Sequence, residues 1–130
     1  MTAYITVNIP CETQFRRDIL TTAVEGGIHY WINEDAVNEE GVSTCEVARA
    51  SDLSVTCVSW EAEGAYFAVN DIHILDALQR IVRGDKIKYL GTSSRNEITS
   101  AVQTQDAGEI DADLADVIFQ IAAFGEVVYG

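Results

Sequence analysis

Apolar and polar positions alternate at the start of the chain and then change to a helical spacing. Residues 3–9 alternate, which is typical of a half-buried strand, and Pro10 ends it. From Thr13 the apolar residues recur every three or four positions, which predicts a helix that ends in a left-handed turn at Gly26-Gly27. Residues 28–33 then predict a short aromatic strand.

The middle of the chain predicts three further strands. Residues 42–49 and 53–61 have the pattern of a hairpin, and its register places Cys45 opposite Cys57. We expect both to be reduced, buried thiols. A cross-strand disulfide is the alternative and would need an oxidising compartment. Another strand follows over 65–69.

The second half is dominated by helical stripes. The predicted helices begin at Asn70 or Asp71, at the capping-box pattern Ser94–Glu97 and at Asp111, and end at Gly84, near Gln105 and at Gly125. Residues 86–90 predict a short strand or connector, and 126–129 a final strand or packed terminus. Helices and strands do not alternate one for one, which favours a single α+β domain over residues 1–130. We expect a mainly antiparallel sheet of about five strands with about four helices.

Composition narrows the class of protein. Apolar residues make up 48% of the 130 positions, enough for a core without metals or disulfides. The first residues lack the pattern of a signal peptide, and no apolar run is long enough to span a membrane. The three cysteines form no Cys-x-x-Cys pair. We therefore expect a cytoplasmic protein with no metal and no cofactor.

The charge is strongly acidic and unevenly distributed. The chain has 21 acidic and 8 basic side chains, a net charge of −13. Residues 34–71 hold nine acids against Arg49, and residues 106–130 hold six acids and no base. Between them, residues 72–105 are net basic. This balance argues against nucleic acid as a direct partner, because phosphate binding needs a concentrated basic surface.

The acidic charge supports two interpretations. The first is a solubility trait or an adaptation to high salt, and the second is a surface that docks on a basic groove of a host protein. A docking surface would gather its carboxylates on one face. The candidate binding residues are those of the acidic loop, namely Glu34, Asp35, Glu39 and Glu40.

A second hypothesis is a small-molecule site. His29 and Trp31 would share one face of the aromatic strand and could stack on a planar, nucleotide-like ligand. The anionic part of such a ligand would contact the basic residues Arg80, Arg83 and Lys86. A packed aromatic strand is the simpler explanation of the same pattern.

Catalysis is the third hypothesis and has the least support. His29 or His73 could act with nearby carboxylates, yet no recognised hydrolase, nucleotide-binding or zinc pattern is present. Gly26-Gly27 lies between a predicted helix and a predicted strand, the reverse of a phosphate-binding loop. We assign no catalytic residue.

Two segments carry a resemblance. The sequences LTTAVEGG with Tyr30-Trp31, and DADLADVIFQIAAFGEVVYG at the end, are similar to small uncharacterised proteins of actinobacteria and their phages. The resemblance implies a phage or mobile-element setting and no particular chemistry. Our first hypothesis is therefore an accessory binding protein that inhibits a host factor or defence system. The oligomeric state is left open, a homodimer included.

Overall fold

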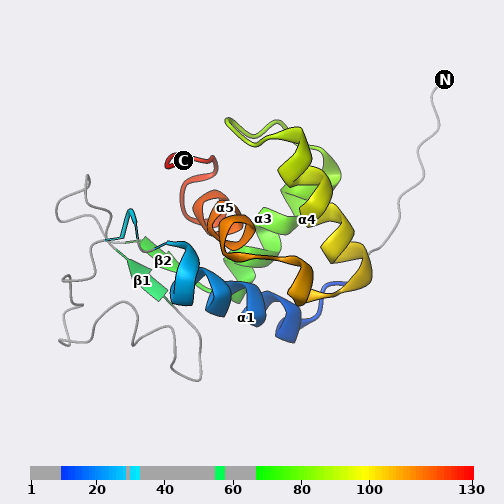
Figure 1. Cartoon of the computed structure of the whole chain (residues 1–130), viewed down its shortest axis with the longest axis horizontal. Helices are drawn as coiled ribbons and strands as arrows, with labels where there is room; N and C mark the ends of the chain where they lie inside the picture. The colour runs from blue at the N-terminus through cyan, green and yellow to red at the C-terminus, as the bar shows by residue number, and fades with distance from the viewer. Residues whose placement is uncertain (1–9, 29, 33–54, 58–66) are drawn as a thin grey trace.

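Helices carry most of the chain that the structure describes, as Figure 1 shows. This computed structural model describes residues 10–28, 30–32, 55–57 and 67–130. Its α-helices are α1 (Thr13–Thr22), α3 (Asp71–Arg83), α4 (Thr92–Thr104) and α5 (Ala112–Phe124). The π-helical segment η1 (Ala23–Gly27) continues α1, and the 3-10 turn η2 (Ala107–Glu109) precedes α5.

The expected α+β fold with a five-stranded sheet is wrong. Among the described residues, the only sheet is one antiparallel pair, β1 (Val55–Cys57) with β2 (Phe67–Val69), and Ile32 forms an isolated bridge. Instead of the expected strand, Ile28 lies in a bend, Tyr30 and Trp31 in a turn and Ile32 in a single bridge, and the backbone N–H groups of Trp31 and Ile32 both bond to the carbonyl of Ile28. Local bonds of this kind use up the donors that a strand would offer to a neighbour.

Two segments for which a strand was one of two predicted alternatives adopt the other alternative. Residues 86–90 form a connector with a turn at Lys88 and Tyr89, and residues 126–129 form a packed terminus without regular structure. The strands expected over 3–9 and 42–49 lie outside the described residues. In the observed ladder Cys57 pairs with Phe67, and the predicted Cys45–Cys57 pair stays a prediction because Cys45 is not described.

The core is built around α5. This helix is apolar around most of its circumference, so it is buried on several sides by η1, α1, α3 and β2. Its largest buried side chain, Phe119, is fully enclosed together with Trp31 and isoleucines from α1 and α3. The helices thus pack on helices, and the fold needs no broad sheet to cover its apolar surface.

Local signals placed several helix ends correctly. Asn70 begins α3 with a capping box in which it accepts from the backbone of His73 and His73 accepts in return. Asp111 caps α5 by accepting from the Leu114 N–H at 2.8 Å. Gly84 and Gly125 end these helices with left-handed φ values of 85° and 79°. The capping box expected at Ser94–Glu97 is wrong, since α4 begins at Thr92 after Gly91.

The Gly26-Gly27 pair does not end the helix in a left-handed turn, as was expected, but allows a close packing contact. Neither glycine has a positive φ, and the chain continues from α1 through η1 without a left-handed stop. A Cβ added to Gly27 would lie 2.5 Å from the carbonyl oxygen of Ala112 and 3.2 Å from Cβ of Asp116. Glycine is therefore needed for the close approach of η1 to the first turns of α5.

Candidate functional site

A buried carboxylate, Asp116, lies where η1, the following turn and α5 meet. Its Oδ1 accepts from the indole N–H of Trp31 at 2.7 Å and from the side-chain amide of Gln120 at 3.0 Å. Its Oδ2 accepts from the hydroxyl of Tyr30 at 2.6 Å. Asp116 is only 6% exposed, so it is not part of the acidic surface. Three neutral donors offset the cost of burying the carboxylate.

Tyr30 connects this buried group to the surface. Its side chain is 56% exposed, while its hydroxyl points inward to Asp116. Burial of the hydroxyl, with the adjacent Asp116 carboxylate, raises the pKa of Tyr30 above its ordinary value near 10. The phenol therefore stays protonated and acts as a hydrogen-bond donor, which makes it a poor nucleophile or base.

Gln120 joins the same network to the C-terminal tail. Its Oε1 accepts from the backbone N–H groups of Val128 and Tyr129, and its Nε2 donates to the carbonyl of Tyr129. The ring of Tyr129 stacks on Trp31 with centroids 5.1 Å apart and planes 7° apart. Both sets of contacts hold the tail against the core. The network is structural and leaves the Trp31 ring covered.

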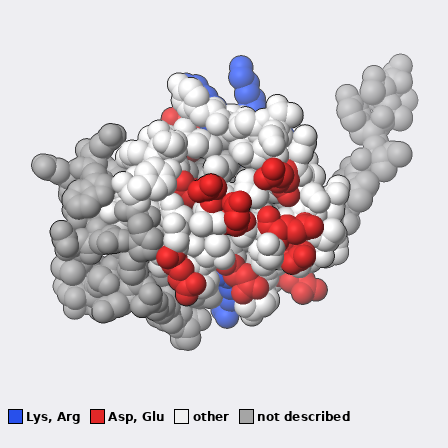
Figure 2. All heavy atoms as spheres, viewed as in Figure 1, with Lys and Arg blue, Asp and Glu red and all other residues white. Residues whose placement is uncertain are grey.

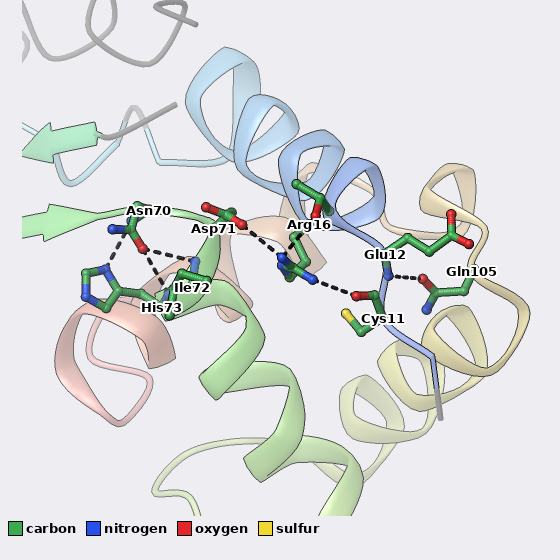
Figure 3. A network of polar contacts seen from close by, with 9 residues as sticks. Cys11, Glu12, Arg16, Asn70, Asp71, Ile72, His73 and Gln105 are labelled. Carbon is green, nitrogen blue, oxygen red and sulfur yellow. Dashed lines mark hydrogen bonds and ion pairs between the residues drawn. The ribbon is translucent and has the colours of Figure 1, made fainter. Parts of the chain in front are cut away.

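A second polar network links α1 to α3 (Figure 3). Arg16 donates to the carbonyl of Cys11 at 2.6 Å and pairs with the Asp71 carboxylate at 2.9 Å. On the far side of Asp71, Asn70 and His73 complete the capping box. Burial raises the pKa of the Cys11 thiol, although Arg16 opposes the shift. Apart from the buried Nε of Arg16, which has no hydrogen-bond partner, the contacts of these groups explain their positions in the fold.

The largest feature left without a structural role is an acidic face. Figure 2 shows carboxylates gathered over α1, η2 and the start of α5. Contacts bring these elements together, because α1 touches η2 and α5, and the Glu12 N–H bonds to Gln105 just before η2. We define the acidic face by the exposed acidic residues of these segments, of their N-caps and of η1, namely Glu12, Asp18, Glu25, Asp106, Glu109, Asp111 and Asp113.

The carboxylates of the acidic face form no ion pair with a basic side chain among the described residues. Asp106 and Asp111 cap η2 and α5, which gives these two a role in folding. Asp18 and Glu109 accept only from Gln14 and Thr104. Neighbouring negative charges without counter-ions repel one another and create a one-sided negative potential.

The binding residues predicted from the sequence differ in where the structure places them. The acidic loop of Glu34, Asp35, Glu39 and Glu40, and also His29, lie outside the described residues. Trp31 is 2% exposed and covered by Phe119, Phe124 and Tyr129, so its ring offers no face to a ligand. His73 is exposed and belongs to the α3 cap.

The three basic residues of the proposed ligand site make different contacts. Arg80 donates to the carbonyl of Gly125, and Arg83 pairs with Asp85 at 2.6 Å. Lys86 is exposed in the loop after α3. The structure therefore supplies no shared pocket between Trp31 and these three cations within the described chain.

Sequence reasoning missed the central polar pair. Asp116 and Gln120 are four residues apart and so lie on one side of α5. Two polar residues on one side of an otherwise apolar helix were a signal that this side meets polar donors. On the same helix Asp113 is exposed whereas Asp116 is buried, a difference that the acidic composition does not reveal.

The described residues hold no group of three or more His, Cys, Asp or Glu arranged to bind a metal ion. Within the same residues, every helix is too short or too polar to cross a membrane. Comparison of the chain with protein-family models, with curated proteins and with solved structures finds no match in any of the three.

Proposed function

We propose that the chain is a binding protein that docks through its acidic face on a basic surface of a partner protein. The setting implied by the sequence is a phage or mobile element, in which such a protein would inhibit a host factor or defence system in the cytoplasm. The observation that carries the proposal is the gathering of seven exposed carboxylates, without cationic partners among the described residues, over α1, η2 and the start of α5 (Figure 2).

The face is suited to electrostatic recognition because its scaffold is fixed. η1 is packed against α5 through Gly27, and Gly26 lies 3.6 Å from the Cβ of Ala112. Glu25 and Asp113 flank that contact from the two elements. Fixed carboxylates attract a basic groove without first losing side-chain and backbone freedom, which favours fast association.

Solubility alone explains the charge less well than docking does. Carboxylates that serve only solubility can be scattered, and repulsion favours scattering. Capping accounts for Asp106 and Asp111, yet it does not account for Glu12, Asp18, Glu25 or Asp113 on neighbouring elements. A concentrated face gives a directed field toward a basic partner.

The test compares two variants of equal net charge. The face variant carries Glu25→Gln and Asp113→Asn, and the control carries Asp76→Asn and Glu126→Gln, which lie on α3 and in the tail. Exposed carboxylates contribute little to stability, so both should fold like the wild type. Tagged forms are incubated with host lysate at low and high salt, and the retained proteins are identified by mass spectrometry.

We expect a stoichiometric basic partner that the wild type and the control retain and the face variant loses at moderate salt. Association of the purified partner with the face variant should be about tenfold slower, because two central charges no longer attract it. A partner retained equally by both variants, with the same salt dependence, would refute docking through this face.

A further inference from the structure

A second surface is left unexplained by the proposed function, in the loop between α3 and α4. Lys86, Lys88 and Tyr89 are all exposed there, and Tyr89 is 82% exposed, the most of the large apolar side chains described. Neither lysine contacts a carboxylate of the described chain. We call these three residues the basic loop. In Figure 1 this loop projects at the top of the molecule, away from α1.

The basic loop is held rigidly from beneath. Ile87 is buried, and its carbonyl accepts a hydrogen bond from the Leu90 N–H. Arg95 donates to the carbonyls of Ile81 and Asp85 at the end of α3. The Val127 N–H bonds to the carbonyl of Lys88, which ties the loop to the tail. Such a loop presents its side chains with little entropy left to lose on binding.

Tyr89 has a conformation that the fold itself does not require of a tyrosine. Its φ is 65°, in the left-handed region where a bulky side chain is unfavourable and Asn or Gly is common. The ring is not used in the core. A strained, exposed aromatic residue on a rigid loop is typical of a contact point, because Tyr is among the residues that contribute most at protein interfaces.

The local charge defines the chemistry of the partner. Arg80 and Arg95 donate to backbone carbonyls and form no ion pair among the described residues, whereas Arg83 pairs with Asp85. Asp85 is the acidic group near all three arginines, so one carboxylate faces three guanidinium groups. This end of the molecule is therefore locally positive on a chain of net charge −13. A projecting loop suits a broad surface better than a small ligand, which needs a concave site. The matching surface is acidic.

We propose that the basic loop of one copy docks on the acidic face of a second copy. Most of the complementary charges lie on different parts of the molecule. Figure 2 shows Lys and Arg side chains projecting at the upper edge and most carboxylates across the centre and lower part, with one basic side chain at the lower edge. The contact is therefore head-to-tail, and the pair keeps one unused face on the first copy and one unused loop on the second. Self-association occupies the acidic face and so competes with the partner of the proposed function, on which the inference otherwise does not depend.

The first measurement is the mass of the purified full chain by sedimentation velocity. At roughly 20 mM salt the average mass should rise above the 14.2 kDa of one chain as concentration increases. At about 500 mM salt it should return to that of one chain, because the contact is mainly electrostatic. The proposal would be overturned if the wild-type chain stays a single copy at low salt up to about 0.5 mM. That concentration is well above the dissociation constant we expect for a small charged interface.

The second measurement uses two complementary variants. The loop variant carries Lys86→Gln, Lys88→Gln and Tyr89→Asn, and the reversed-face variant carries Glu25→Lys and Asp113→Lys. Asn accepts the left-handed conformation, so the loop variant should melt at the same temperature as the wild type or higher. Each variant alone should be a single copy. An equal mixture should form a dimer that grows no further, because it contains one intact loop and one intact face.

The control carries Asp76→Lys and Glu126→Lys, which change the net charge as the reversed face does and should still associate. Association that survives in the loop variant, or that the reversed face leaves unchanged, would refute head-to-tail contact. The proposal would also be refuted if a single-stranded oligonucleotide binds the wild type and not the loop variant, while the protein alone remains a single copy. The lysate test uses protein too dilute to self-associate, so a failure of the self-association proposal leaves the result of that test unchanged. The two proposals can therefore fail separately.

Discussion

The contact of Gly27 with α5 gives the sharpest test of how the acidic face is built. In the substitution Gly27→Ala, the added Cβ would lie 2.5 Å from the Ala112 carbonyl oxygen and 3.3 Å from the Asp116 backbone nitrogen. Both atoms belong to the backbone, so neither can move aside as a flexible side chain would. The whole of η1 must shift away from α5, or α5 must shift away from η1.

The magnitude follows from overpacking. Insertion of a methyl group into a closely packed contact costs about 1–3 kcal/mol, and a clash with backbone favours the upper part of that range. The shift would also lengthen the bonds from Tyr30 and Trp31 to the buried Asp116, leaving a buried carboxylate less well solvated. For a domain of this size we expect a melting temperature lower by about 8–12 °C.

Gly26→Ala is the matched control. A Cβ at Gly26 would lie 3.6 Å from the Cβ of Ala112, an ordinary van der Waals distance. Alanine also favours helical backbone over glycine by up to about 1 kcal/mol. The control should therefore melt at the wild-type temperature or slightly above it. Thermal unfolding followed by circular dichroism, with urea melts for the free energy of unfolding, measures both variants.

A Gly27→Ala protein as stable as Gly26→Ala would show that η1 does not approach α5 as closely as the structure has it. The assignment of Glu25 and Asp113 to one face would then lose its main support. If instead only Gly27→Ala is destabilised, its tryptophan fluorescence should also change in the folded state, because Trp31 donates to Asp116 beside the clash.

Three further predictions concern the network and the helix caps. Deletion of residues 126–130 removes the Gln120 bonds and the Tyr129 stack, and should lower the melting temperature by about 4 °C or more, whereas an unchanged melting curve would contradict the packed tail. Since the pKa of Tyr30 is raised in the folded state, its contribution to stability is present below pH 10 and is lost above it. Urea melts from pH 8 to 11 should therefore show that the stability advantage of the wild type over Tyr30→Phe shrinks as pH rises. A constant difference in the free energy of unfolding would refute this. Asn70→Ala should lower the free energy of unfolding by about 1 kcal/mol through loss of the α3 cap, while the exposed Gln79→Ala on the same helix should have almost no effect.

Much of the second half of the chain could be predicted from local signals. The ends of α3 and α5 follow from Asn70, Gly84, Asp111 and Gly125, because a cap is made between residues only a few positions apart. The packing of the tail was one of two predicted outcomes. The acidic balance and the absence of a recognised catalytic pattern also come from the sequence alone.

The tertiary structure decided the region after α1 and with it the site. Residues 28–33 have the composition of a strand, yet Gly27 brings η1 against α5, and Trp31 turns inward to donate to Asp116. Ile28, Trp31 and Ile32 are buried while Tyr30 is exposed, a spacing of three and four that a strand does not produce. The partner of Trp31 lies 85 positions away, so no local pattern could reveal it.

The same reasoning applies to the charges. The sequence determined how many carboxylates there are and how they divide into blocks along the chain. Only the packing of α1, η2 and α5 placed Asp18, Glu25 and Asp113 on one face, and only it buried Asp116. Charge along a chain is fixed by composition, whereas a field has a direction only when distant segments are held side by side.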